Sequence, residues 1–406
     1  MNIRALTGFL DPGWPLDAKR IAAVAACLAN AREALGEAGY AVQSLRLATP
    51  PPREMSRPVP AAERPALARQ LEAEGFVRGI DYSAIGPALP DEPDGYAVIP
   101  DVLAATETIF ASGLYADLEG GLSLTAAGAC AGIIQRASSI TPDGFANLRF
   151  AALANVPPGA PFFPAAYHGG GPPGLAIATE AAVLAVDALR DVPSLTTARR
   201  RLVSMIEAHG AALTRVAQRV AAASEMQFLG IDFSLAPFPD PARSLGAALE
   251  ACGVPAAGLA GTLTAAAFLT DCLDQAQFPR TGFCGLLLPP LEDDRLAARA
   301  AEGLLSIEDL LLYAAVCGTG LDTVPLPGDS SVEALTAVLL DLGALSLRLN
   351  KPLTARLMPI PGKAAGDEVN FDFAYFAPSR VMALPAQPLT GLLTGAGAVP
   401  IGPHRT

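Results

Sequence analysis

At 406 residues, the chain is long enough for one large domain or for two or three ordinary ones. Its formal net charge of -12 argues against a nucleic-acid partner, because binding a phosphate backbone requires a basic surface. The densest basic run, 199–201, is typical of the solvated face of a helix. Two long uncharged stretches, 251–270 and 384–403, are interrupted by Gly and Pro, so the sequence predicts no membrane partner.

The amino-terminal residues and the cysteines bear on the cellular compartment. The first residues lack a basic region followed by a long apolar run, which is the pattern of an export signal. The cysteines are widely scattered and form no CxxC motif, so reduced thiols are expected instead of a disulfide framework. These features predict a cytoplasmic protein and leave a homo-oligomer, such as a homodimer, open.

Hydrophobic periodicity predicts alternating strands and helices along the chain. Residues 3–10 and 42–48 are predicted strands on either side of a helix at 16–37, which makes a βαβ unit with parallel strands. Further helices are predicted at 63–74, 104–110, 126–138, 176–190, 196–224, 242–252, 296–301, 307–317 and 332–349. Further strands are predicted at 76–80, 96–99, 147–153, 228–235, 282–288, 353–360 and 369–376.

The alternation predicts an α/β fold with ligand chemistry at the carboxyl ends of its strands. No internal repeat is present, and no linker is long enough to force a division into domains. We therefore predict a single domain over residues 1–406. The last part of it, 377–406, is a tail rich in Pro and Gly that is expected to wrap the surface.

The stretch 317–363 is the strongest candidate for a functional site. It places a thiol, acids, lysines and an arginine beside Gly and Pro turns, in a chain with only 17% charged residues. Rigid turns of this kind often carry functional groups. Two shorter pieces, 230–237 and 291–294, have a similar character. We predict that these segments form the rim of one pocket.

Five acids lie in these turn-rich contexts. Grouped carboxylates either hold a hard cation or share protons, although each acid alone could equally cap a helix or close a turn. Asp232 and Glu292 are the candidates for proton transfer, or for ligands of Mg²⁺ or Mn²⁺ together with Asp293. Asp322 is a further catalytic candidate, and Asp329 is a candidate for binding the substrate.

The basic and hydroxyl side chains of the same segments are candidates for holding an anion. Arg356 could offer a two-pronged contact to a carboxylate or phosphate, whereas lysines act as point charges. The alternative is that these cations neutralise the nearby acids in buried ion pairs. The candidate substrate-binding residues of this kind are Ser234, Thr319, Lys351, Arg356 and Lys363. Arg46, close to the carboxyl end of the predicted strand at 42–48, is a further candidate for contacting the ligand, with a salt bridge as the alternative.

One histidine and one cysteine complete the candidate catalytic set. His168 precedes three glycines in a loop and is a candidate second proton-transfer group. Cys317 would be a nucleophile if a neighbouring cation lowered its pKa, and otherwise a small buried thiol. Three histidines and scattered cysteines do not make an ordinary structural zinc site.

Several of these motifs resemble a known family. The segments 42–50, 161–168, 230–237, 287–293, 317–329 and 350–363 are similar to the family called domain of unknown function 711, or uncharacterised protein family 0210. The resemblance implies a large α/β barrel of the pyruvate formate-lyase-like type, with about ten strands ringed by helices, and implies no established reaction. Gly395 and Gly397 lack the flanking arginine and tyrosine of glycyl radical enzymes, so radical chemistry is not expected.

Two classes of function remain open from the sequence. The first is an enzyme, a non-radical lyase, isomerase or hydrolase, that acts on a small polar anionic metabolite by acid/base chemistry, with or without a divalent metal. The second is a metabolite-binding protein or scaffold subunit without catalytic activity. The number of titratable groups in the predicted pocket favours the enzyme.

Overall fold

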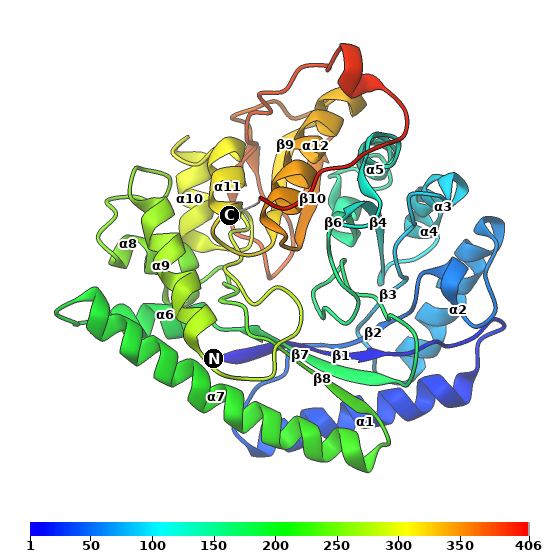
Figure 1. The fold of residues 1–406 in the computed structure, drawn as a ribbon, viewed down its shortest axis with the longest axis horizontal. Helices are drawn as coiled ribbons and strands as arrows, with labels where there is room; N and C mark the ends of the chain where they lie inside the picture. The colour runs from blue at the N-terminus through cyan, green and yellow to red at the C-terminus, as the bar shows by residue number, and fades with distance from the viewer. Residues whose placement is uncertain (405–406) are drawn as a thin grey trace.

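The computed structural model describes residues 1–404 and centres on one sheet of eleven strands, with helices packed outside it (Figure 1). The main path of the sheet is β8-β7-β1-β2-β3-β4-β6-β10-β9, with β5 paired to β4 and β13 paired to β5. The strands are β1 (Asn2–Phe9), β2 (Leu45–Ala48), β3 (Tyr82–Ala84), β4 (Ile109–Asp117), β5 (Gly121–Ser123), β6 (Phe150–Ala154), β7 (Gly174–Glu180), β8 (Gln227–Asp232), β9 (Gly320–Pro327), β10 (Leu353–Ile360) and β13 (Ala398–Val399). A separate pair consists of β11 (Glu368–Val369) and β12 (Ser379–Arg380).

The helices cover the outer side of this sheet. Helices α1 and α7 lie side by side and pack against β1 and β8, while α5 and α12 pack together against β4 and β6 (Figure 1). The helices are α1 (Ala18–Glu37), α2 (Arg64–Val77), α3 (Pro93–Ala97), α4 (Ile99–Ala104), α5 (Leu124–Ala137), α6 (Ala182–Leu189), α7 (Leu195–Ala223), α8 (Leu245–Ala251), α9 (Thr262–Gln275), α10 (Asp294–Ala301), α11 (Ile307–Ala314) and α12 (Val332–Leu349). None of the helices formed by residues 1–404 has both the length and the apolar character to cross a bilayer.

The predicted βαβ unit at the start of the chain is confirmed. The side chain of Asp17 caps α1 by accepting from the backbone N–H groups of the first turn. The strands β1 and β2 are parallel neighbours, with Leu6 opposite Leu45. Helix α1 approaches β1 so closely that a Cβ on Gly8 would lie 2.4 Å from Val24, so only glycine allows this packing.

The direction of the strands reverses twice across the sheet. Strands β1, β2, β3, β4 and β6 are mutually parallel. On one side β7 is antiparallel to β1, and on the other side β10 is antiparallel to β6. The amino ends of the five central strands therefore lie at the same edge as the carboxyl ends of β7 and β8.

The sheet is also strongly curved. Strands β1 and β7 face β9 and β10 across the centre of the molecule, with the helices outside both groups (Figure 1). Side chains from strands that are distant in the sheet order can consequently meet on the concave face. The structure thus has the mixed α/β character that the sequence predicts, with a large central sheet flanked by helices.

Several sequence-based assignments are wrong. Residues 76–80 and 96–99 are not strands, because they fall in and after α2 and in α3 and α4. The expected helix at 104–110 is wrong, because α4 ends at Ala104 and β4 begins at Ile109. In the expected helix at 176–190, the first residues belong to β7 and only the later ones to α6. Strand β9 is not among the predicted strands, since its segment contains Gly and Pro, yet it is buried along almost its whole length. Short apolar runs have no clear period, so burial within the sheet decides their structure.

The last residues follow the surface, as the composition predicts. The tail includes β13, which pairs with β5, and most of residues 384–404 are exposed or half-buried. The predicted strand at 369–376 is reduced to the two residues of β11. The rest of that segment carries aromatic side chains inward, where Phe371 and Phe376 pack with Phe145.

Candidate functional site

A cavity of about 420 Å³ lies on the concave side of the sheet. Its wall combines charged groups from the strands with aromatic side chains from strands and loops. The charged wall residues are Arg4, Arg46, Glu107, Arg149, Asp232, Glu292 and Arg356, and the aromatic ones are Tyr82, Phe110, Phe145, Phe162, Phe163, Phe373 and Tyr375. Its volume falls within the ordinary range for small-molecule sites.

The position of the cavity corrects one expectation. Arg46 and Tyr82 lie at the amino ends of the central strands β2 and β3, not at their carboxyl ends. Thr179 and Ser234 lie at the carboxyl ends of β7 and β8, which run in the opposite direction. The cavity therefore lies at carboxyl ends, as predicted, only for β7 and β8, which run opposite to the central strands.

Arg356 on β10 is the most tightly paired cation of the cavity. Its Nε donates to Asp322 at 2.6 Å, and its Nη2 donates to Glu292 at 2.8 Å. Asp322 is aimed at Arg356 by an irregularity in the β9–β10 pairing, where Thr323 has a φ of 44°. This φ is unusual for a β-branched residue and marks locally strained backbone. The prediction that these groups lie together is confirmed for Asp322, Glu292 and Arg356.

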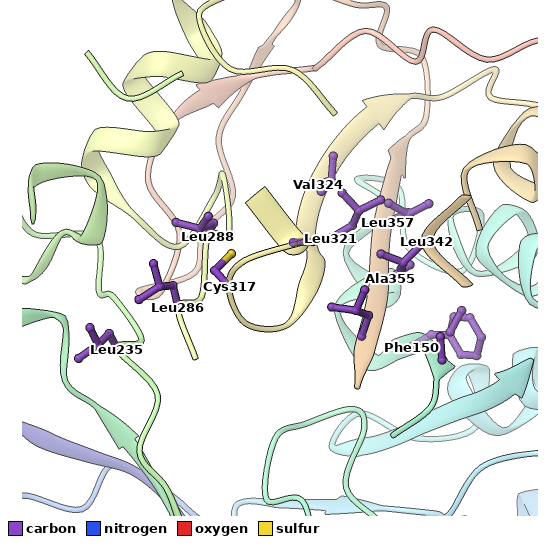
Figure 2. Packing of buried hydrophobic residues seen from close by; sticks show 14 of the residues in the cluster. Phe150, Leu235, Leu286, Leu288, Cys317, Leu321, Val324, Leu342, Ala355 and Leu357 are labelled. Carbon is purple, nitrogen blue, oxygen red and sulfur yellow. The ribbon is translucent and has the colours of Figure 1, made fainter. Parts of the chain in front are cut away.

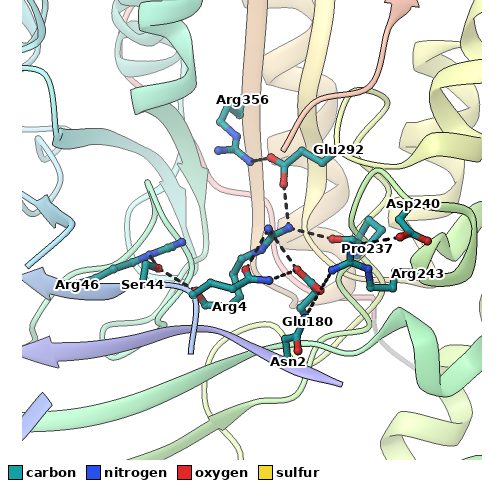
Figure 3. Close-up of polar contacts among 11 residues, drawn as sticks. Asn2, Arg4, Ser44, Arg46, Glu180, Pro237, Asp240, Arg243, Glu292 and Arg356 are labelled. Atoms are coloured by element: carbon teal, nitrogen blue, oxygen red, sulfur yellow. Dashed lines mark hydrogen bonds and ion pairs between the residues drawn. The ribbon is translucent and has the colours of Figure 1, made fainter. Parts of the chain in front are cut away.

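Arg4 on β1 extends this network from the opposite side of the cavity. Its Nη2 contacts the second oxygen of Glu292 at 3.3 Å, and its Nη1 lies 3.5 Å from Glu180. Glu180 also pairs with Arg243 at 3.2 Å, so the charges alternate from the interior toward the surface (Figure 3). The ring of Tyr375 lies 4.9 Å beneath the guanidinium of Arg4.

Arg46 on β2 differs from these two arginines. Its Nε donates to the hydroxyl of Ser44 at 2.9 Å, but within the described chain no carboxylate pairs with it and its two terminal nitrogens make no hydrogen bond. Its guanidinium instead lies against aromatic rings, 5.0 Å from the centre of Phe163 and 5.8 Å from that of Tyr82. Burial, together with the positive charges of Arg4 and Arg356, lowers the pKa of Arg46 to about 10.

Glu292 is the carboxylate that the cavity holds between arginines. Its side chain is only 13% exposed, and burial raises its pKa above the ordinary value. The charges of Arg356 and Arg4 oppose this rise, and that of Asp322 adds to it. The arginines thus favour the charged form of Glu292, whereas burial and Asp322 favour its neutral form. A carboxyl group in such a setting is suited to exchange a proton.

Asp232, the last residue of β8, lines the cavity but has a structural role in holding the turn at 282–284. Its oxygens accept from the backbone N–H of Phe283 at 2.9 Å and of Cys284 at 3.0 Å, and from the hydroxyl of Ser234. A Cβ on Gly282 would lie 2.3 Å from its Oδ2, so the turn closes directly over the carboxylate. Burial nevertheless raises the pKa of Asp232.

Asp293 is fully buried and caps α10 instead of facing the cavity. It accepts from the hydroxyl of Ser244 at 2.6 Å and from backbone N–H groups at the starts of α8 and α10. These donors occupy the lone pairs that a cation would need. In the part of the chain that the structure describes, no three His, Cys, Asp or Glu side chains are arranged to hold a metal ion. The geometry therefore gives no support to Mg²⁺ or Mn²⁺ at Asp232, Glu292 and Asp293.

Three residues of the stretch around 317 lie away from the cavity, and two of them, Cys317 and Thr319, are buried. The side chain of Cys317 packs among apolar residues such as Leu286 and Leu321 (Figure 2), and burial raises its pKa to about 12. Lys351 donates to the carbonyl oxygens of Ala314 and Cys317, so it closes the carboxyl end of α11. Thr319 is 1% exposed and does not line the cavity.

Three other candidates also lie away from the cavity wall. His168 is 5% exposed, and its Nε2 lies 3.4 Å from the carbonyl oxygen of Gly171, so it is held within its own loop. Burial lowers its pKa. Asp329 and Lys363 are exposed on the turns that follow β9 and β10. Polar residues beside Gly and Pro mark turns whether or not a turn faces a cavity.

The sequence analysis missed several residues of the cavity. Arg4 was overlooked, although a lone charge within an apolar strand is a signal, because a buried arginine needs a partner. Arg149, Tyr82 and Tyr375 gave no such signal, since they lie at the ends of short elements or in loops. Only the curvature of the sheet brings them to the same cavity.

The fold and the cavity together define an α/β protein with an internal, arginine-rich pocket lined by aromatic rings. The model of the family described as Uncharacterised ACR (DUF711) matches residues 14–374, and the chain belongs to this family. The resemblance found in the sequence is thereby confirmed.

Relatives from archaea and bacteria carry the same family name. A UPF0210 protein of Pyrobaculum islandicum is 32% identical over 81% of this chain and 76% of its own. One of Pyrobaculum aerophilum is 34% identical over 64% of this chain and 60% of its own. One of Desulfovibrio desulfuricans is 27% identical over 90% of this chain and 85% of its own. These names state no reaction, so the function must be argued from the cavity.

Proposed function

We propose that this chain is an enzyme that binds a small organic anion in the cavity and acts on it by acid/base chemistry. The observation that carries the proposal is Arg46. Its guanidinium is half-buried in the cavity wall, and its two terminal nitrogens donate to no group of the described chain, so they are free to bind an acceptor in the cavity. A carboxylate or phosphate group would supply this acceptor with a two-pronged, charge-assisted contact.

The rest of the cavity suits an apolar body behind the anionic group. Phe110 packs edge-on against Tyr82 at 5.5 Å and against Phe163 at 5.3 Å between ring centres. Tyr82 and Phe163 support the guanidinium of Arg46, and together with Phe110 they form an apolar wall beside it. A ligand with a small aromatic or hydrocarbon body would bury apolar surface against this wall.

Glu292 is the residue proposed to exchange a proton with the bound ligand. It lines the cavity, its pKa is raised, and both of its oxygens are fixed by Arg4 and Arg356. A carboxyl group held in one position with a raised pKa is a competent general acid or base near neutral pH. Tyr82, on the same wall as Arg46, supplies a hydroxyl to a bound ligand.

The test measures binding first and turnover second. Thermal unfolding of the chain is recorded with benzoate, octanoate and phenyl phosphate, because bound ligand raises the melting temperature by mass action. The variant Arg46→Met should lose the stabilisation by these anions, whereas Arg380→Met, at an exposed arginine, should keep it. An undiminished stabilisation of Arg46→Met would place the anion elsewhere and defeat the proposal.

A binding protein without turnover is the second candidate function. It is favoured by the fact that Asp232 is committed to a turn and that His168 and Cys317 lie outside the cavity, which leaves Glu292 as the main titratable group. The variant Glu292→Gln separates the two functions. An enzyme would lose turnover of its ligand while retaining binding, whereas a binding protein would show turnover in neither form.

We also propose that the sheet closes into a barrel of about ten strands. The segment 280–288 supports this, because it runs parallel to β8 through bridges from Ile231 to Arg280 and from Leu235 to Leu286. On its other side, a Cβ on Gly318, just before β9, would lie 1.9 Å from the carbonyl oxygen of Leu286. This segment would fill the gap between β8 and β9. A crystal structure with an open gap there would contradict closure.

A further inference from the structure

We infer that the ligand of this cavity carries two acidic groups joined by an apolar body, and that Arg149 binds the second group. This inference rests on the proposed function, in which Arg46 binds the first group. It narrows the ligand class from small anions in general to compounds with an anionic group at each end, such as dicarboxylates or carboxylated phosphate esters.

Arg149 is a second cavity arginine without a carboxylate partner. It is 8% exposed, and no carboxylate within residues 1–404 forms an ion pair with it. Its Nη1 donates to Thr106 and to the carbonyl oxygen of Ile109, and its Nη2 donates to the carbonyl oxygen of Leu103 at 2.8 Å.

These contacts hold the guanidinium of Arg149 in place but use only part of its capacity. An arginine has five N–H donors, and the three hydrogen bonds leave the Nε–H and the second hydrogen of Nη2 without an acceptor in the described chain. Nε and Nη2 lie on the same edge of the guanidinium. A carboxylate or phosphate oxygen pair fits such an edge with two parallel hydrogen bonds.

The register of the sheet shows what separates the two arginines. Arg46 on β2 lies opposite Tyr82 on β3. Phe110 on β4 lies opposite Ala84, which is two residues beyond Tyr82 on β3. Ala111 lies opposite Phe150, so Arg149, the residue before β6, follows next to Phe110, and both side chains line the cavity. From β2 across β3 and β4 to the start of β6, the side chains therefore form a row that consists of a cation, two aromatic rings and a second cation: Arg46, Tyr82, Phe110 and Arg149.

This row sets the shape of the ligand. Strands β2 and β6 lie three places apart in the sheet, which corresponds to ~14 Å along its surface and less across the concave face. An apolar body would lie over Tyr82 and Phe110, with an acidic group at each end. Glu107, whose side chain is exposed at the wall near Arg149, is well solvated and therefore opposes the second anion only weakly.

The alternative is that Arg149 only anchors the loop before β4. Leu103, Thr106 and Ile109 all belong to the segment that connects α4 with β4, and a buried arginine could hold that segment without touching a ligand. An anchoring role predicts that the number of acidic groups on a ligand makes no difference to its affinity. The two roles therefore predict different relative affinities of the wild-type protein for ligands with one and with two acidic groups.

The test compares matched ligands with one and two acidic groups. Dissociation constants are measured by calorimetry for benzoate against terephthalate and for octanoate against suberate. We expect the diacid of each pair to bind at least tenfold more tightly, because its second group gains a charge-assisted contact with Arg149. In Arg149→Gln the advantage of the diacid should disappear while the monoacid binds as before, and Arg149→Lys should retain part of it.

The outcomes separate this inference from the proposed function. If monoacids bind through Arg46 but diacids gain nothing, Arg149 is only an anchor and the inference fails while the proposed function stands. If neither class of acid binds, the proposed function fails as well. Should Arg149→Gln not fold, the wild-type protein still tests the inference, because equal affinities for monoacid and diacid would overturn it without any variant.

Discussion

Arg4 and Arg356 bind opposite oxygens of one carboxylate, Glu292, although their strands lie five places apart in the sheet. In a flat sheet, strands β1 and β10 would be ~24 Å apart. The shared carboxylate therefore requires the sheet to curl around the cavity, and it joins the two sides of the curve (Figure 3). These ion pairs span the concave face of the sheet. They therefore stabilise the curvature that brings their charges together.

The first prediction concerns stability. Glu292→Gln removes the charge between two buried arginines and should lower the free energy of unfolding by about 3 kcal/mol, the lower end for breaking a buried pair, because each arginine keeps a second carboxylate. The control Glu368→Gln, at a glutamate that is 85% exposed, should cost less than about 1 kcal/mol. Urea unfolding measures both. Equal costs would mean that Glu292 does not join the two sides.

The second prediction concerns pH. A bound carboxylate adds negative charge near Glu292, which already faces Asp322 as well as Arg4, Arg46 and Arg356 and has a raised pKa. The protonated form of Glu292 therefore favours the ligand, so binding takes up protons. Affinity for benzoate should weaken as pH rises through the pKa of Glu292, which lies above its ordinary value of about 4.3.

Calorimetry from about pH 5.5 to 8.5 checks this linkage, since benzoate stays ionised over that interval. The variant Glu292→Gln should bind benzoate with little dependence on pH, because its amide does not titrate. A wild-type affinity that strengthens as the pH rises would contradict the assignment of the proton to Glu292.

The third prediction concerns thiol reactivity. Cys317 is 3% exposed and its pKa is raised to about 12, so almost none of it is thiolate at neutral pH. The folded protein should leave Cys317 unmodified by iodoacetamide while the half-buried Cys252 reacts slowly. Peptide mapping by mass spectrometry reads out both sites. Rapid modification of Cys317 without unfolding would restore its candidacy as a nucleophile.

The fourth prediction concerns the contact between the segment 280–288 and the start of β9. Gly318→Ala would force a methyl group against the carbonyl oxygen of Leu286 and should destabilise the protein by about 1–3 kcal/mol. The matched control is Gly132→Ala in α5, where a Cβ meets nothing within 4 Å. It should stabilise by about 0.5–1 kcal/mol through helix propensity. Chemical unfolding of both variants would show whether the close contact is present in solution.

The sequence by itself determined the elements with a strong local signal. The βαβ unit at the start, the long helices α7 and α12, and β10 are set by apolar periodicity and by capping residues such as Asp17 and Ser331. These features act within a few residues of one another, so a pattern read along the chain detects them. The same holds for the family, whose motifs are contiguous.

Only the tertiary structure decided which charged residues form the site. Glu292, Asp322, Arg356, Arg46 and Ser234 were expected together and lie in or beside the cavity, because their strands or adjoining loops reach the concave face. Lys351, Cys317 and His168 looked equivalent in sequence but fill other parts of the fold.

The same structure also added Arg4 and Arg149 to the cavity. Residues at turns beside Gly and Pro share one local character, whereas the side of the sheet that each faces depends on strand order and direction. The order β8-β7-β1-β2-β3-β4-β6-β10-β9 and its two reversals come from long-range pairings. Curvature then converts that order into a cavity, because it moves distant strands to opposite walls of one enclosed space.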